Sequence, residues 1–202
     1  VIHAHTENRG DEAAVKAMVD ELLIKYPGAK ITISNNGFTP YPGMPENVIQ
    51  IDRFPKLESR IAQLEFFIVL LFKGKFALTK EARRFIRALK EADVVLHAPG
   101  GPSIGDTYFK AEKLYLWRLN LIRRMGIPYI FYAPSMGPFN CASRNKLRKE
   151  VISGAERIVL RDPISVKYVK DFLPGVEVEQ ALDSALQHDI DIDKNERKYN
   201  NY

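Results

Sequence analysis

The stretch "VIHAHTENRGDEAAVKAMVDELL", residues 1–23, decides the fold class of this chain. Its first five residues are typical of a buried strand, and small and long apolar residues recur at helical spacing after a polar turn. A strand that runs directly into a helix is the repeating unit of an α/β domain. Ligands of such domains bind outside the carboxyl ends of the strands, so the turn between strand and helix is expected to carry ligand-binding groups.

The alternation of strand and helix continues along the chain. Short apolar runs bounded by Gly and Pro predict further strands at 29–35, 47–51, 93–98, 128–133, 157–161 and 176–180. Helical periodicity predicts helices at 11–26, 56–72, 80–92, 108–125, 142–153 and 164–173. The helix at 56–72 is apolar on most faces and is expected to be buried. The fold class predicted is α/β, with a Rossmann-like, doubly wound, mainly parallel sheet.

The expected domain organisation is one Rossmann-like domain over 1–186. Residues 187–202 are polar and charged, and we expect them to form a linker or the start of a C-terminal domain. The chain begins in mid-strand without a methionine, so we expect it to be trimmed at both ends.

Composition narrows the class of protein. Cys141 is the only cysteine among 202 residues, which excludes an intramolecular disulfide and favours a reducing, cytoplasmic location. The net charge of +5 suits an anionic small molecule or membrane surface, whereas the scattered basic residues argue against nucleic acid binding. The longest apolar run, 66–72, is far shorter than the roughly 20 residues that span a bilayer.

The first exit loop carries an unusual polar set. Gly10 lets the backbone approach a ligand, and the following helix N-terminus favours an anion. Asp11 and Glu12 occupy that same terminus. Either they cap the helix, or Asn8 and Asp11 hold ligand hydroxyls, or one carboxylate acts as a base.

Two later exit loops are rich in glycine and proline. Gly100 and Gly101, in 99–106, form either a backbone cradle for a phosphate or carboxylate or a plain turn. Neither a Walker A loop nor a G-x-G-x-x-G fingerprint is present. In 134–139, Gly137 shapes a rigid turn and Ser135 is placed to hydrogen-bond a ligand.

A further exit loop contains Arg161, directly after a strand. An arginine there either recognises a carboxylate or phosphate or pairs with Asp162 or Asp183 to lock the loops. Asp162 followed by Pro163 predicts a strong helix start.

The histidines offer few candidates. His97, at the end of a buried strand, fits a core histidine better than a ligand. We expect His3 and His5 to diverge, so that only one reaches the crevice; His5, nearer the strand end, is the weak catalytic candidate beside Asp11 and Glu12. No cluster has the spacing of metal ligands, so no metal site is expected.

Five segments in this order resemble one family, the polysaccharide pyruvyl transferases. They are NRGDEA (8–13), ADVVLHAPGG (92–101), SMGPF (135–139), LRDPIS (160–165) and ALDSAL (181–186). One departure is Pro99, which stands where a third glycine is common in the family.

The resemblance implies an enzyme that moves the pyruvyl unit of phosphoenolpyruvate onto a sugar of a cell-surface polysaccharide or its precursor. The sugar would end as a cyclic ketal, phosphate would leave, and no metal or nucleotide cofactor would be needed. It also implies the N-terminal half of a two-domain, GT-B-type enzyme. The family's catalytic histidine and main donor-binding arginines match no position here, so we expect the isolated chain to be inactive.

By the same resemblance, this half shapes the acceptor side of a cleft. Substrate contacts would come from the loops described above: Asn8, Gly10, Asp11, Gly100, Gly101, Ser135, Gly137 and Arg161. The expected partners are a saccharide acceptor and phosphoenolpyruvate, and the oligomeric state stays open.

Two rival functions remain open. The first is half of a GT-B glycosyltransferase that uses a nucleotide sugar. The second is a non-catalytic Rossmann-like binding module whose basic helices meet a partner or the inner face of a membrane. The apolar, basic-flanked run 61–75 leaves peripheral membrane association open; otherwise it is a buried core helix or a surface left bare by a domain outside this chain.

Overall fold

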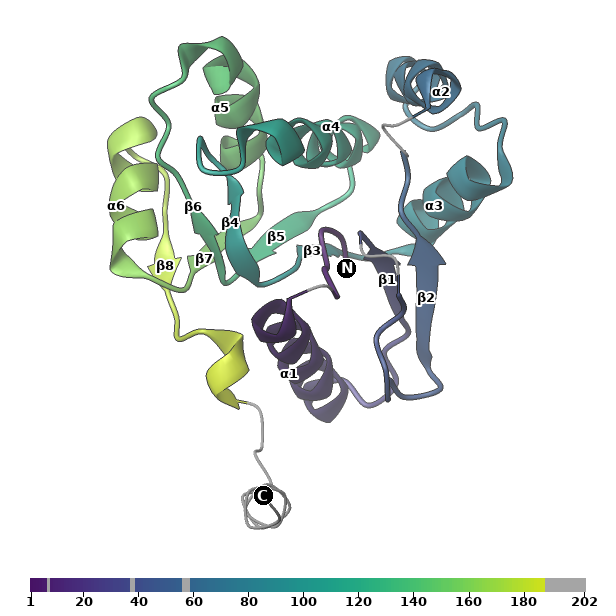
Figure 1. Cartoon of the computed structure of the whole chain (residues 1–202), viewed down its shortest axis with the longest axis horizontal. Helices are drawn as coiled ribbons and strands as arrows, with labels where there is room; N and C mark the ends of the chain where they lie inside the picture. The colour runs from purple at the N-terminus through teal and green to yellow at the C-terminus, as the bar shows by residue number, and fades with distance from the viewer. Residues whose placement is uncertain (7, 37–38, 56–58, 188–202) are drawn as a thin grey trace, which may run out of the picture.

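The computed structural model describes residues 1–6, 8–36, 39–55 and 59–187 of the chain. They form an α/β domain in which the strand pairings are parallel (Figure 1). The predicted fold class, a Rossmann-like parallel sheet flanked by helices, is confirmed. The tail expected at 187–202 lies outside the described residues except for Gln187, which ends the 3-10 helix η2 (Ser184–Gln187).

The N-terminal segment joins two sets of strands into one layer. One set is β1 (Ile31–Asn35) beside β2 (Val48–Asp52); the other runs β3 (Val95–His97), β5 (Tyr129–Tyr132), β7 (Arg157–Leu160), β8 (Glu179–Gln180). Ile2 bridges His97 and Ala4 bridges Asn35, both in parallel. Residues 1–5, predicted as a buried strand, therefore lie between β1 and β3, although they pair through isolated bridges only.

The helices begin and end near the predicted positions. They are α1 (Arg9–Lys25), α2 (Arg60–Leu71), α3 (Lys80–Glu91), α4 (Phe109–Met125), α5 (Asn145–Ser153) after a 3-10 turn η1 (Ala142–Arg144), and α6 (Pro163–Phe172). Asp162 caps α6 by accepting a hydrogen bond from the Ser165 N–H, as the Asp-Pro pair predicts.

Alternate strand residues face two apolar clusters, one on each side of the sheet. Leu96 packs with α1 residues Val15 and Met18, whereas Val95 belongs to the cluster that buries α3, α4 and α5. The α1 side is the smaller layer, and η2 packs against it.

The two exit segments expected to be loops are partly strands. Gly100–Ile104 forms β4 and Pro134–Met136 forms β6, and the two pair in parallel as a separate small sheet. Gly100 lies opposite Pro134 in this pairing. The expectation of free loops was wrong because the segments satisfy their backbone groups against each other.

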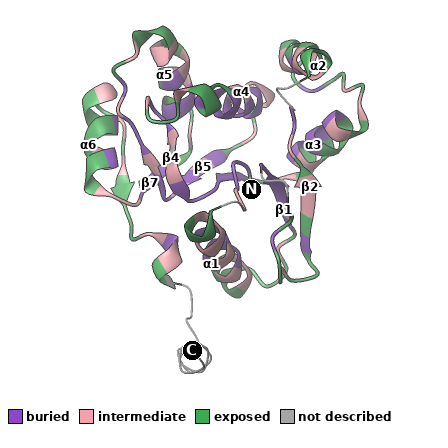
Figure 2. Ribbon diagram, viewed as in Figure 1, coloured by how far each residue is buried: buried purple, intermediate pink, exposed green. Residues whose placement is uncertain are grey.

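The expectation that the apolar helix is buried was also wrong. In α2 only Glu65, Phe66 and Val69 are buried, and one whole side of the helix is exposed (Figure 2). Periodicity alone could not decide this, because a helix that is apolar all round can face either a core or a partner.

Candidate active site

The N-terminus of α1 lies against the glycine segment of β4. Asn8 caps the helix, its Oδ1 accepting a hydrogen bond from the Gly10 N–H at 2.8 Å. Gly100 has φ +140, and a Cβ placed on it would lie 2.6 Å from Oδ1 of Asp11. Only glycine allows this approach, so the Asp11 carboxylate rests directly on the backbone of β4.

Asn8 supplies the capping hydrogen bond, while Asp11 and Glu12 lie in the first turn of α1, where their charges favour the helix dipole. The Glu12 side chain is only 18% exposed and pairs with Arg9 at 3.3 Å. Asp11 is partly exposed and makes no hydrogen bond with any described residue. Of the polar residues in this loop, Asp11 is thus the one whose side chain remains open to a ligand. Gly101 follows in β4 with no such close approach.

A second polar cluster is centred on Arg161. Its Nε donates to the Ser135 hydroxyl at 2.9 Å, and its Nη1 pairs with Asp183 at 2.6 Å. Ser135 in turn donates to the Asp162 carboxylate at 2.8 Å. The interpretation that Arg161 locks the loops through Asp183 is confirmed. Its Nη2 makes no hydrogen bond with the described residues, and the side chain stays partly exposed.

Asp162 remains an anion within this cluster. Partial burial alone would raise the pKa of its carboxyl, but hydrogen bonds from Ser165 and Ser135 and the nearby Arg161 charge outweigh burial and lower it. The carboxylate therefore keeps Ser135 and the start of α6 in place at neutral pH.

Gly137 fixes the turn that leaves β6 toward η1. It has φ +88, and a Cβ there would lie 2.7 Å from Cδ2 of Tyr168. Its N–H donates to the Ile104 carbonyl of β4 at 2.8 Å, and its bond to Pro138 is cis. This confirms a tight turn but assigns Gly137 a packing role between β4 and α6.

The β4–β6 pairing brings the two polar clusters to one edge. Because Gly100 is opposite Pro134, the Asp11–Gly100 contact lies beside Ser135 and hence beside Arg161. Asp183 directly precedes η2, which packs on α1. Residues from five separate segments therefore lie near one another at the carboxyl end of the sheet.

Both N-terminal histidines lie on the same side of the sheet, so the expectation that they diverge was wrong. The rings of His3 and His5 lie 4.4 and 6.0 Å from that of Tyr115. Residues two apart on an extended segment point the same way. His5 is partly exposed, and its Nε2 meets the Tyr115 hydroxyl at 2.6 Å.

His97 is a core histidine, as expected. Its Nδ1 lies 2.8 Å from the Ala98 carbonyl, which can only accept, so Nδ1 carries the proton and Nε2 accepts from Ser103. Burial lowers the pKa of His97 to about 4 and also lowers that of His3. The imidazole rings of His3 and His97 are therefore both neutral at pH 7.

A buried arginine completes this region. Arg118 is fully buried; its guanidinium donates to the Phe54 carbonyl at 2.5 Å and to Asn36, while Nη2 has no hydrogen-bond partner among the described residues. Burial lowers the pKa of Arg118 to about 9. Asn36 links this cation to His5, 3.4 Å away, so the histidine is held from two sides.

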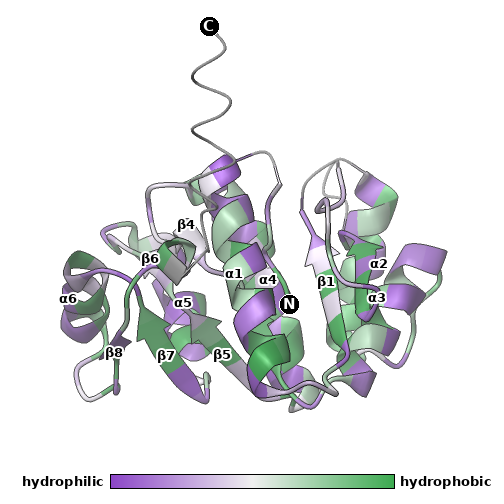
Figure 3. Ribbon diagram, turned by 90° about the horizontal axis from the view of Figure 1, so that it is seen from below, coloured by the Kyte–Doolittle hydropathy of each residue, from purple (hydrophilic) through white to green (hydrophobic). Residues whose placement is uncertain are grey.

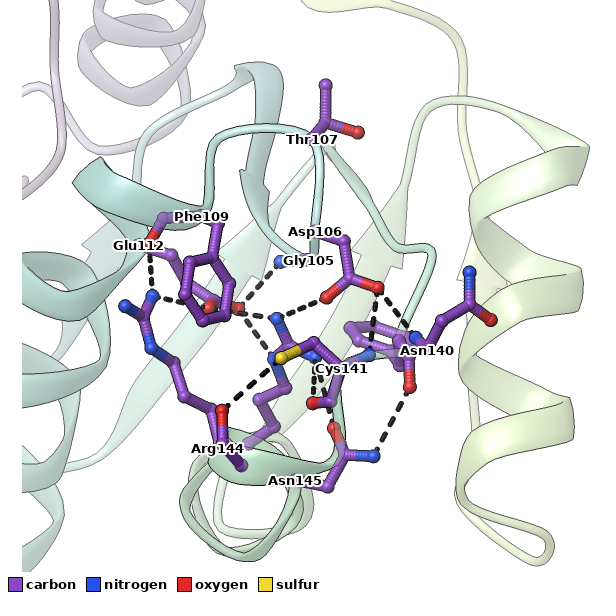
Figure 4. A network of polar contacts seen from close by, with 12 residues as sticks. Gly105, Asp106, Thr107, Phe109, Glu112, Asn140, Cys141, Arg144 and Asn145 are labelled. Carbon is purple, nitrogen blue, oxygen red and sulfur yellow. Dashed lines mark hydrogen bonds and ion pairs between the residues drawn. The ribbon is translucent and has the colours of Figure 1, made fainter.

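A buried ion network that the sequence analysis did not predict lies behind the site (Figure 4). Glu112 of α4 receives hydrogen bonds from Arg148 of α5 at 2.7 and 2.9 Å, from Arg144 at 3.0 Å and from the Gly105 N–H at 2.8 Å. Asp106 also pairs with Arg148, at 2.8 Å. The network ties the end of β4 to α4 and α5.

The charges in this network stabilise one another. Burial alone would lower the pKa of Arg148, but the hydrogen bonds that it donates to the Glu112 and Asp106 carboxylates outweigh burial and raise the pKa. Glu112 and Arg148 could have been suspected, because each occupies a core-facing position of its helix. Within the described residues, no group of His, Cys, Asp and Glu is arranged to hold a metal ion.

The comparisons with known proteins agree with the motifs. The family model of polysaccharide pyruvyl transferase matches residues 8–202, which is nearly the whole chain. No curated protein and no solved structure gives a significant match. On the family match, the chain belongs to the polysaccharide pyruvyl transferases.

Proposed function

We propose that the chain takes part in transferring a pyruvyl group from phosphoenolpyruvate to a sugar of a polysaccharide or its precursor, as the N-terminal, acceptor-side domain of a GT-B-type enzyme. In this reaction the methylene carbon of the donor gains a proton and two sugar hydroxyls bond to the adjacent carbon. Phosphate leaves, and the product is a cyclic ketal.

The observation that carries the proposal is the meeting of Asp11, Gly100, Ser135, Arg161 and Asp183 at one sheet edge. These residues lie in the five segments that mark the family. A partly exposed carboxylate without a described partner suits sugar hydroxyls, which donate hydrogen bonds.

Arg161 is proposed to meet an anionic group of the donor. Its Nε and Nη1 are fixed by Ser135 and Asp183, which leaves Nη2 oriented and without a described partner. A guanidinium held in this way loses little freedom when it binds a carboxylate or phosphate. Asp183 would share the guanidinium with the ligand.

Thermal unfolding with added ligands tests the donor class. We expect phosphoenolpyruvate to raise the melting temperature and UDP- or GDP-sugars to leave it unchanged. At a ligand concentration of about 100 times Kd, the stabilisation is about 2.7 kcal/mol, or roughly 5–10 °C for a chain of this size.

Arg161→Gln should weaken this protection, and Arg157→Gln is the matched control. Arg157 also pairs with a carboxylate, Glu179 at 2.5 Å, but its side chain is exposed at the start of β7. Protection by a nucleotide sugar instead would favour the glycosyltransferase alternative. If both variants lose the same thermal stabilisation by phosphoenolpyruvate, Arg161 does not bind the donor.

A further inference from the structure

The outer side of α2 is an exposed apolar surface. Ile61, Leu64, Phe67 and Leu71 recur at helical spacing and are 76, 63, 49 and 64% exposed. Large apolar residues scattered singly on a surface are ordinary, but a contiguous row marks an interaction site. The helix lies at one rim of the domain, next to α3 (Figures 1 and 3).

The buried side of α2 holds the helix in this orientation. Phe66 stacks on Trp117 of α4 with ring centroids 5.7 Å apart. The buried Glu65 carboxylate accepts hydrogen bonds from the Leu78 and Thr79 N–H groups at 2.7 and 2.6 Å and from the Thr79 hydroxyl at 2.8 Å. Turning the apolar row inward would break these contacts, so its exposure is built into the fold.

The apolar surface continues into the connection between α2 and α3. Phe72, Phe76 and Leu78 are 44, 53 and 64% exposed, and the rings of Phe72 and Phe76 lie 4.9 Å apart. Together with the row on α2, these residues form what we call the α2 patch: Ile61, Leu64, Phe67, Leu71, Phe72, Phe76 and Leu78.

Basic residues flank and interrupt the α2 patch in the sequence. Residues 60–87 contain seven Lys and Arg but only two acidic residues, of which Glu65 is buried. Lys73 and Lys75 lie within the patch and are exposed, and Lys80, Arg83 and Arg84 follow on the exposed side of α3. A partner that matches this surface therefore has negative charges on its outside and an apolar interior directly below them.

We infer that the α2 patch docks the domain on an anionic lipid bilayer, with α2 lying in the interface. A helix with an apolar face and flanking lysines and arginines binds in this way, through buried apolar area and attraction to anionic headgroups. No helix among the described residues is long and apolar enough to cross a membrane. A second copy of the chain fits less well, because pairing two patches would bring like charges together.

Vesicle flotation tests the docking. The purified protein should float with phosphatidylglycerol–phosphatidylcholine vesicles, bind pure phosphatidylcholine weakly, and dissociate as salt rises. The double variant Ile61→Ser, Leu64→Ser should lose at least tenfold in partitioning. The control Ile24→Ser, Ile164→Ser alters residues of matched exposure, 75 and 63%, outside the patch and should bind like wild type.

A charge variant tests the second component. Lys73→Gln with Lys75→Gln should weaken binding roughly fivefold for each lysine removed. Lys146→Gln with Lys170→Gln, at exposed sites on other helices, should change it little.

Three results would overturn the inference. They are no flotation of wild type, equal losses in the patch and control variants, or dimerisation that the patch variant abolishes. Membrane docking does not require the proposed transfer reaction, so either can fail while the other stands.

Discussion

The substitution Glu112→Gln should unfold the domain much more easily, although Glu112 lies beneath the site and contacts no proposed ligand position. Gln keeps the size of the side chain and can still accept from the Gly105 N–H. It removes the charge that faces Arg148, which is fully buried. Breaking a buried ion pair by removing one partner costs about 3–5 kcal/mol, because the other charge stays buried.

Urea unfolding followed by circular dichroism measures this cost. With a slope of about 2 kcal/mol/M, the midpoint should fall by about 1.5–2.5 M with the slope unchanged. Glu150→Gln is the matched control. It removes the same charge from a pair with Arg123 at 2.6 Å, but 34 and 40% of these side chains are exposed, so it should cost less than about 1 kcal/mol.

A midpoint shift for Glu112→Gln no larger than that of Glu150→Gln would refute the reasoning. It would mean that the network of Figure 4 carries no more free energy than a surface pair. If the substitution weakens the hydrogen bond from the Gly105 N–H, that amide should exchange its hydrogen faster, which is a separate measurement.

Three further predictions follow from the same geometry. Gly100→Ala should cost about 1–3 kcal/mol of unfolding free energy and weaken ligand binding, because Gly100 has φ +140 and the new Cβ would collide with Asp11. Gly101→Ala is the control, since a Cβ there meets nothing closer than 3.8 Å. Equal urea midpoints for the two variants would contradict this. The free energy of unfolding should fall as the pH drops from 6.5 to 4, because His97 takes up a proton in the unfolded state but stays neutral when it is buried in the folded state. His97→Gln should reduce that loss by up to about 3 kcal/mol, measured by urea unfolding at several pH values; an unchanged pH profile would count against it. Asp11→Asn should weaken acceptor binding in calorimetry whereas Asp20→Asn, on the same helix, should not; equal affinities would exclude Asp11 from the acceptor side.

The fold was largely predictable because each element carries its own local signal. Thr79 and Asp162 mark helix starts, and Gly126, with φ +75, ends α4 as a left-handed cap. Segment 1–5 could be placed as a strand because apolar residues precede a polar turn.

The errors arose where two distant segments decide the structure together. Whether Gly100–Ile104 is loop or strand depends on Pro134–Met136, and local composition does not encode that pairing. The orientation of α2 is set by the hydrogen bonds of Glu65 to the segment before α3 and by the stacking of Phe66 on Trp117. A run of apolar residues does not indicate which side of the helix will be buried.

The candidate site was predictable as a set of loops but not as a set of contacts. Motif order placed Asp11, Ser135 and Arg161 among the candidates, while the pairing of Arg161 with Asp183 stood as one of two alternatives. The buried partners Glu112, Arg148 and Arg118 were missed, because a charged residue on a helix is usually solvated.

Amide chemical-shift mapping with an acceptor glycoside tests the central claim most directly. The claim predicts perturbations at residues 8–11, at Gly100 and Gly101, and around Ser135 and Arg161, all at the carboxyl edge of the sheet. Perturbations confined to the opposite edge of the sheet would contradict it.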